Sequence, residues 1–222
     1  MRIPWLAMAT AMMLVLIGCG KASGPSDADS QEPVYEGKPA SGWLADLKSD
    51  DAATRLRAAE VLGEAGETRA ISPLVEALQD ENVRVEASEA LGNMGEEAVP
   101  MLVRSLGDRS LAVRRRAAVA LAKIGQAAVP ALTRALRDRN PRVRQEAATA
   151  LGLMGDQARG AVEALEESLS DEEKWVRLQA AEALGEIGAG AREARDGLED
   201  LKDKDASCRF AAAEALRRIG AD

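Results

Sequence analysis

The segment VRRRAAVALAKIG, residues 113–125, contains the pattern that decides the fold. Its apolar residues are spaced to fall on one face of an α-helix: Val113, Ala117, Ala120, Leu121 and Ile124. Gly125 follows the last of them and is predicted to end the helix, because glycine readily adopts the left-handed conformation of a helix cap. The segment therefore predicts an amphipathic helix with one buried face.

Related segments recur along the chain about 30 residues apart. The arginine that follows the first apolar position aligns in one column: Arg55, Arg84, Arg114, Arg144, Arg177 and Arg209. The closing glycine aligns in another column: Gly66, Gly95, Gly125, Gly155, Gly188 and Gly220. Such internal repetition is typical of proteins in which short units stack in a row.

A second apolar run precedes each of these segments, as in AAVPALTRAL at residues 127–136. Pro73, Pro100 and Pro130 occupy matching places near its start, where the missing N–H of proline is tolerated. Each unit is therefore predicted to be a pair of antiparallel helices, and a single pair cannot bury its apolar faces. We predict an all-α fold, an α-solenoid of about six stacked helical hairpins over residues 41–222.

The repeats resemble the short HEAT-like repeats of the phycobilisome-lyase type over residues 41–220. The resemblance implies that the second helix of each hairpin lines the concave side, and that an aspartate before it pairs with the column arginine in a ladder. The expected ladder pairs are Asp108 with Arg114, Asp138 with Arg144, Asp171 with Arg177 and Asp203 with Arg209, each six residues apart. The first two repeats depart from this spacing, with Asp50 before Arg55 and Asp80 before Arg84, so the ladder is not predicted there.

Residues 1–18 are typical of a secretory signal peptide, with Arg2 ahead of an uncharged apolar stretch. The sequence Leu-Ile-Gly-Cys at residues 16–19 resembles the lipobox of bacterial lipoproteins, which implies acylation of Cys19 and attachment to a membrane. Because Gly20 is not aspartate, we expect the outer rather than the inner membrane, with the folded part facing the periplasm. The alternative is an ordinary signal peptide followed by an unrelated cysteine.

Residues 19–40 are rich in glycine, proline, serine and acidic residues, so they are predicted to be a flexible linker to the lipid anchor. The domain organisation is therefore a signal peptide at 1–18, a linker at 19–40 and the solenoid at 41–222.

Composition argues against several functions. The sequence contains no histidine, which removes the usual near-neutral acid–base group and the commonest transition-metal ligand. A net charge of −8 argues against general nucleic-acid binding. Cys208 takes the place of the column valine and is expected in the core. We predict no catalytic residue, cofactor or metal site. Two acidic pairs, Glu60 with Glu64 and Glu182 with Glu186, are the alternative candidates for cation binding or acid–base chemistry, but they are expected to lie on solvated helical faces.

A partner would meet the side of each second helix that lies away from its apolar stripe. The residues predicted for this surface are Arg57, Glu60, Glu64, Glu86, Glu89, Arg115, Arg116, Val119, Lys123, Glu146, Thr149, Leu153, Glu182 and Glu186. The third repeat is basic and its neighbours are acidic, which favours a partner of mixed charge. The alternative is sequence drift on an unused surface. Trp175 is either an exposed anchor for a partner or packed in its turn.

The sequence therefore favours a membrane-anchored scaffold or adaptor of the bacterial cell envelope, expected to be monomeric, that binds an unidentified protein through its concave face. One alternative is an enzyme related to HEAT-repeat bilin lyases or deoxyhypusine hydroxylase. Paired His-Glu motifs hold iron in deoxyhypusine hydroxylase, and no position here can supply the histidine. Another alternative is a structural spacer in the envelope.

Overall fold

The computed structural model describes residues 32–201 and 205–220. Within them the chain forms twelve α-helices, five short 3₁₀-helices and one pair of strands. The predicted signal peptide, Cys19 and Asp203 lie outside the described residues.

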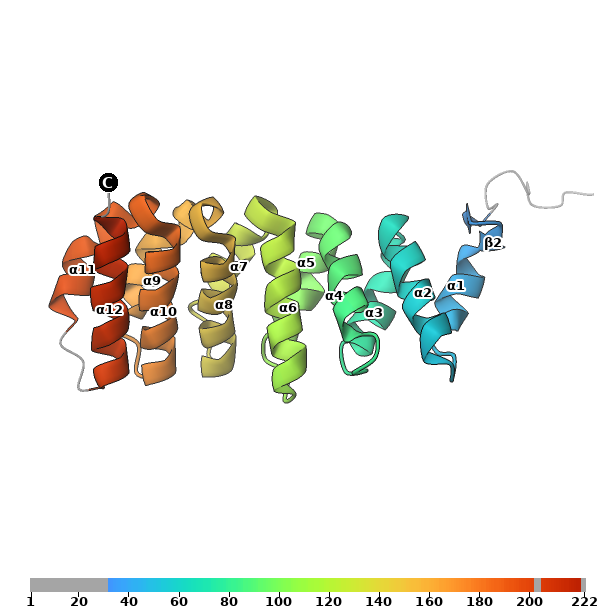
Figure 1. Cartoon of the computed structure of the whole chain (residues 1–222), viewed down its shortest axis with the longest axis horizontal. Helices are drawn as coiled ribbons and strands as arrows, with labels where there is room; N and C mark the ends of the chain where they lie inside the picture. Colours follow the sequence, from blue (N-terminus) through green and yellow to red (C-terminus); the bar gives the residue numbers. More distant parts are fainter. Residues whose placement is uncertain (1–31, 202–204, 221–222) are drawn as a thin grey trace, which may run out of the picture. The chain divides into compact units, whose positions relative to one another are not determined.

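The helices form six hairpins, each with a first (A) helix and a second (B) helix. The hairpins are α1 (Ala40–Asp46) with α2 (Ala52–Glu64), α3 (Ile71–Ala77) with α4 (Arg84–Asn93), α5 (Val99–Ser105) with α6 (Leu111–Ile124), α7 (Val129–Ala135) with α8 (Pro141–Met154), α9 (Val162–Ser168) with α10 (Lys174–Ile187), and α11 (Arg195–Asp200) with α12 (Ala206–Ile219). They stack in chain order, with the B helices on one side and the A helices on the other (Figure 1). The predicted all-α solenoid of about six hairpins is confirmed.

Glycine ends the hairpins in the way the repeat predicts. Gly66, Gly95, Gly125, Gly155 and Gly188 all have positive φ, between 53° and 74°, a conformation that a side chain disfavours. Each leads into or lies just before a 3₁₀-helix that precedes the next A helix: η1 (Thr68–Ala70), η2 (Gly95–Ala98), η3 (Gly125–Ala128), η4 (Gly155–Ala161) and η5 (Gly188–Ala194). Gly220 differs, with φ −98°.

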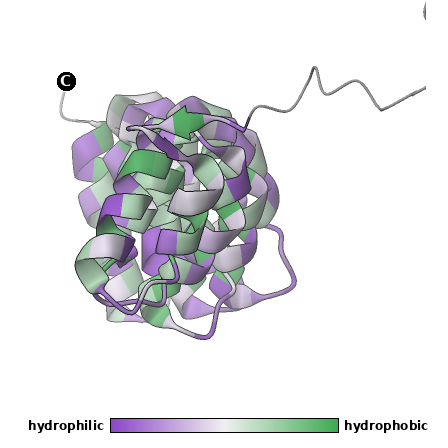
Figure 2. Ribbon diagram, turned by 90° about the vertical axis from the view of Figure 1, so that its right-hand side faces the viewer, coloured by the Kyte–Doolittle hydropathy of each residue, from purple (hydrophilic) through white to green (hydrophobic). Residues whose placement is uncertain are grey.

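The core consists mainly of leucine and alanine, as the low aromatic content requires. In most repeats one leucine of the A helix and one leucine of the B helix are fully buried, for example Leu102 and Leu121. Hydrophilic residues gather on the loops that join A helices to B helices (Figure 2). These loops therefore form a polar edge of the stack, which we call the loop edge.

Neighbouring B helices pack closely against one another. Glycine permits this: a Cβ atom added at Gly63 would lie 2.5 Å from Ala90 Cβ, and one at Gly185 would lie 3.0 Å from Ala215 Cα. The resemblance to HEAT-like repeats implies that this B-helix side is the concave one.

A short β-hairpin precedes the first helix, where the sequence analysis expects a linker through residue 40. Strand β1 (Val34–Tyr35) pairs antiparallel with β2 (Lys38–Pro39), and the turn residues Glu36 and Gly37 both have positive φ. Trp43 Nε1 donates to Tyr35 O at 2.8 Å, and Trp43 packs in the core. The ordered body therefore includes residues 32–39, because the aromatic side chains fasten them to the first repeat.

The arginine–aspartate contacts differ from the expected ladder. Arg144 Nη1 donates to the backbone O of Asp138 at 3.0 Å, while its Nε reaches the carboxylate of Asp171, in the next repeat, at 2.7 Å. Arg55 likewise pairs with Asp80 of the next repeat at 2.7 Å, although no ladder is predicted there. In both pairs the carboxylate belongs to the repeat that follows the repeat of the arginine.

Two other arginines of the expected ladder also bind a backbone carbonyl of the aspartate and not its carboxylate. Arg114 and Arg177 donate to the backbone O of Asp108 and Asp171 at 2.9 and 2.7 Å. The column arginines of the first five repeats thus bind carbonyls of their own A-to-B loops. Arg55, Arg114 and Arg144 also bind the adjoining repeat.

Candidate interaction surface

Each B helix presents three positions, four residues apart, away from the core. The first column of these positions contains Leu56, Val85, Arg115, Gln145, Leu178 and Phe210. The second contains Glu60, Glu89, Val119, Thr149, Glu182 and Glu214. The third contains Glu64, Asn93, Lys123, Leu153, Glu186 and Arg218. We call these three columns the B-helix face.

Most of the predicted interaction residues belong to this face: Glu60, Glu64, Glu89, Arg115, Val119, Lys123, Thr149, Leu153, Glu182 and Glu186. Arg57, Glu86 and Arg116 lie one residue beside the columns. Glu146 does not belong to the surface: it is only 4% exposed, and its carboxylate lies 3.4 Å from Nε of Arg114. Glu146 faces the preceding B helix, so it is a contact between repeats.

A groove opens on this face across α8, α10 and α12. Its volume is about 1050 Å³, and Leu153, Leu178 and Phe210 are the large apolar side chains in its lining. Phe210 is 74% exposed and Leu153 is 58% exposed, both unusual for residues of this size. Gly152 and Gly185 also belong to the lining, at places where neighbouring B helices approach closely.

The sequence analysis does not single out Leu178 or Phe210, although both residues line the groove. The alignment of the repeats could have identified them, because it places both residues in the same column as Arg115, which the sequence analysis assigned to the interaction surface.

Acidic side chains surround the apolar part of the groove. Arg218 lies against the carboxylates of both Glu186 and Glu214, and Gln179 Nε2 donates to Glu182 Oε2 at 2.6 Å. Hydrogen bonds from Arg217, then from Arg218, lower the pKa of Glu214 to about 2, so it remains ionised in all ordinary conditions. The rim therefore carries three carboxylates, and the guanidinium groups of Arg217 and Arg218 bind two of them.

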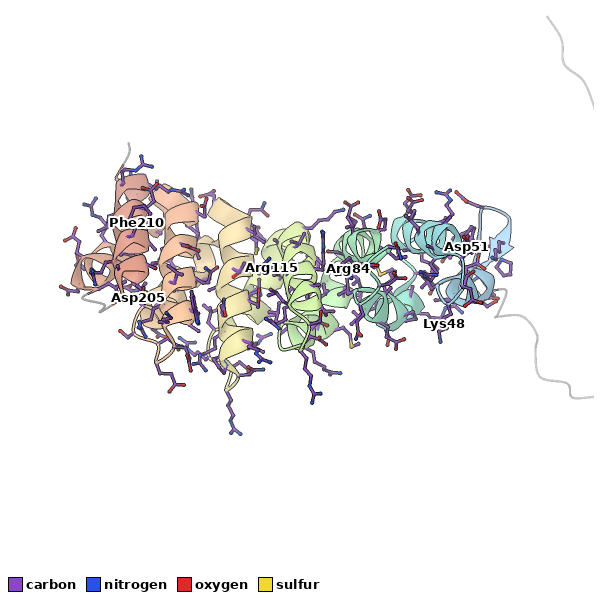
Figure 3. All side chains as sticks on the ribbon, turned by 60° about the horizontal axis from the view of Figure 1, so that its bottom comes forward. Lys48, Asp51, Arg84, Arg115, Asp205 and Phe210 are labelled. Atoms are coloured by element: carbon purple, nitrogen blue, oxygen red, sulfur yellow. The ribbon has the colours of Figure 1, made fainter. Side chains whose placement is uncertain are left out.

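The middle of the B-helix face has the opposite charge. Arg115, Val119 and Lys123 form one stripe along α6, and neither cation forms an ion pair with a described residue. Figure 3 shows Arg115 and Phe210 on separate helices of the row. The face thus has apolar and acidic ends separated by a basic centre.

No group of three or more cysteine and acidic side chains among the described residues could hold a metal ion. Cys208 is buried, as predicted, and its Sγ lies 3.5 Å from Lys174 O. Trp175 is half exposed, with Lys174 Nζ 4.4 Å from its ring centre, so of the two readings its exposure fits the anchor better. No helix within the described ranges is long and apolar enough to cross a bilayer.

The model of the HEAT repeats matches residues 40–122, 80–139, 99–159 and 129–217 in overlapping copies. The chain belongs to the HEAT repeat family. This agrees with the resemblance in the sequence and with the stacked hairpins. The search of curated proteins found no match.

Solved structures of helical repeat proteins are similar. The complex of CpcE and CpcF of phycocyanin lyase from Nostoc sp. PCC7120 is 25% identical, with 66% of this chain and 98% of that chain covered and a TM-score of 0.52. An engineered protein is 27% identical, covering 82% and 96%, with a TM-score of 0.46. Human deoxyhypusine hydroxylase in complex with glycerol is 26% identical, covering 82% and 85%, with a TM-score of 0.45.

Proposed function

We propose that this HEAT-repeat chain is a protein-binding module that holds a segment of a partner protein in the groove across α8, α10 and α12. The observation that carries the proposal is the exposure of Leu153 and Phe210 in the lining of one groove. Apolar side chains in a hollow bind well because their removal from water contributes about 25 cal/mol per Å². HEAT repeats in general are suited to protein–protein interaction.

The chemistry of the groove indicates the kind of segment that fits. Its floor accepts apolar side chains, and the carboxylates of Glu182 and Glu186 favour Lys or Arg beside them. A short amphipathic helix with both features would lie across three B helices. The proposed occupant is therefore an apolar segment of a partner protein that carries positive charge.

We also propose that Cys19 carries a lipid anchor and that the module is tethered in the bacterial envelope, at the outer membrane and facing the periplasm. The support is the lipobox-like sequence at residues 16–19 and the polar composition of the segment that follows it. In this proposal the chain acts by binding and is not an enzyme, which fits the absence of histidine from the sequence.

Site-specific photocrosslinking in cells tests the groove. We expect a crosslinking amino acid in place of Phe210 or Leu178 to give one and the same protein adduct. Glu163, exposed on helix α9, is the matched control position and should give none. The variant L153E/F210E should weaken the interaction by at least about ten-fold, since it places two charges where apolar side chains bind. Equal adducts from Glu163 would contradict the proposal.

Metabolic labelling with a fatty-acid analogue tests the anchor. We expect label on the wild type and none on C19S, which should leave the membrane fraction while C208S stays in it. Unlabelled wild-type protein would overturn the anchor and leave the groove proposal standing, because binding of the partner can be measured on its own.

A further inference from the structure

Basic side chains without an ion pair gather in the third and fourth repeats. Those that form no ion pair with a described residue are Arg104, Arg109, Arg115, Arg116, Lys123, Arg134, Arg139 and Arg142. Arginines of other repeats are commonly paired, as Arg57 is with Glu60 and Arg217 with Glu214. A protein with a net charge of −8 thus leaves its unpaired cations concentrated in one region.

Five of these arginines lie together at the loop edge. Arg104 and Arg134 are in the last turns of α5 and α7, Arg109 and Arg139 are in the loops that follow, and Arg142 is the second residue of α8. The two loops touch, since a Cβ atom at Gly107 would lie 3.1 Å from Asn140 Nδ2. We call the five arginines the basic edge.

The acids nearest in sequence do not pair with the basic edge. Asp108 and Asp138 are the only acidic residues between residues 104 and 142. Their carboxylates accept hydrogen bonds from the backbone N of Ser110 and Asn140, at 2.7 and 2.8 Å, and so shape the turns. The basic edge therefore presents five guanidinium groups to solvent against two engaged carboxylates.

The loop edge is acidic on both sides of these repeats. In the second repeat, residues 76–83 contain Glu76, Asp80 and Glu81 and no basic residue. In the fifth, residues 166–173 contain Glu166, Glu167, Asp171, Glu172 and Glu173 and no basic residue. The unpaired arginines of the loop edge are therefore concentrated over two repeats, or about 20 Å at the usual spacing of packed helices.

We propose that the basic edge binds an acidic polypeptide segment of about six residues. Guanidinium groups bind carboxylates through paired hydrogen bonds, and an extended segment of this length spans the two repeats. The acidic flanks would repel a longer polyanion or a flat anionic bilayer, so they favour a short ligand. The surface is distinct from the B-helix groove, and the inference does not rest on that groove.

Fluorescence anisotropy of the full chain with a labelled octapeptide of alternating Glu and Ala tests the proposal. We expect saturable binding that weakens as salt rises, and binding at least about ten-fold weaker for the matched peptide of Gln and Ala. The variant R109E/R139E/R142E should lose at least about ten-fold in affinity. The control R57E/R159E/R217E changes the net charge equally on other repeats and should stay within about two-fold of the wild type.

Three results would overturn the proposal. Equal losses in both variants would show that net charge alone drives binding. Undiminished binding of the Gln peptide would show that carboxylates are not recognised. Vesicles with phosphatidylglycerol that bind the chain through the same arginines, when the Glu peptide does not bind, would identify a membrane surface instead. Circular dichroism checks that both variants remain folded. If R109E/R139E/R142E does not fold, R109Q/R139Q/R142Q takes its place.

Discussion

At the scale of single residues, burial decides how much an ion pair stabilises this fold. The side chains of Arg144 and Asp171 are 10% and 11% exposed, and two hydrogen bonds join them, at 2.7 and 2.9 Å. The side chains of Arg137 and Glu167 are 59% and 53% exposed. Removal of one partner leaves an uncompensated charge only in the first pair.

We expect R144A to lower the free energy of unfolding by about 3 kcal/mol and R137A by less than about 1 kcal/mol. Urea denaturation of the two variants measures the difference. The double variant R144A/D171A should lose less than the sum of its single changes, because it leaves no buried charge alone. Additive losses would show that the two residues act independently.

Glu67 joins the first β-hairpin to the second repeat. Its carboxylate accepts hydrogen bonds from Nε of Arg69 at 2.9 Å and from the hydroxyl of Tyr35 at 3.1 Å. The bonds from Arg69, ahead of that from Tyr35, lower the pKa of Glu67 from 4.5 to about 2. Because the folded pKa is the lower one, the stabilisation is present above about pH 4.5 and is lost as the pH falls toward 2.

We therefore expect E67Q to lower the melting temperature at pH 7, and the difference from the wild type to shrink between pH 5 and pH 2.5. Thermal denaturation followed by circular dichroism provides the measurement. D196N, which changes an exposed acid of α11, serves as the control and should show no such convergence. A gap that widens in acid would reverse the assigned sign.

At the scale of helices, two neighbouring glycines of the first repeat have different roles. Gly63 lies inside α2 and allows Ala90 of the next B helix to approach. Gly66 has φ +63° and open space around it. Packing therefore constrains the first residue, whereas backbone conformation constrains the second.

We expect G66A to lower the free energy of unfolding by about 1 kcal/mol, the usual penalty of a side chain in the left-handed region. Helix propensity alone would have G63A stabilise α2 by about 1 kcal/mol. The close approach of Ala90 should reverse this and make G63A the more destabilising change. Denaturant titrations of both variants decide, and a stabilised G63A would show that the repeats can move apart.

The sequence predicted the helical elements well and their contacts less well. The glycine and arginine columns predicted the hairpins, because each repeat forms them from local residues. The partner of Arg144 could not be found this way, since Asp171 belongs to another repeat and its reach depends on how the repeats stack. The β-hairpin was missed because each strand has only two residues, too few for an alternating pattern.

Glu146 and Phe210 show the same limit at the candidate site. Helical spacing places both on the side of a B helix, but the neighbouring helix covers Glu146 and leaves Phe210 exposed. The charge pattern of the face was readable from aligned repeats. The groove was not readable in this way, because its lining comes from three B helices and depends on how they pack together.

At the scale of the whole molecule, stability arises between adjacent repeats. Each hairpin contacts mainly its sequence neighbours, so no single repeat should be essential to the fold. Excision of residues 115–144 would join Arg114 to Gln145 and keep the repeat in register. We expect this shortened chain to fold, with unchanged helical signal per residue and a lower melting temperature. Complete unfolding would contradict a stack held by nearest neighbours.

The central claim is that the B-helix face receives the partner through its apolar groove. Hydroxyl-radical footprinting of the full chain, alone and with the partner protein identified by crosslinking at position 210, tests it most directly. The radicals oxidise exposed aromatic and leucine side chains, so a side chain that the partner covers is oxidised less. The account predicts that oxidation of Phe210 and Leu153 falls in the complex, while Leu111, which is exposed outside the groove, is oxidised as before. Protection of Leu111 with none at Phe210 and Leu153 would contradict it.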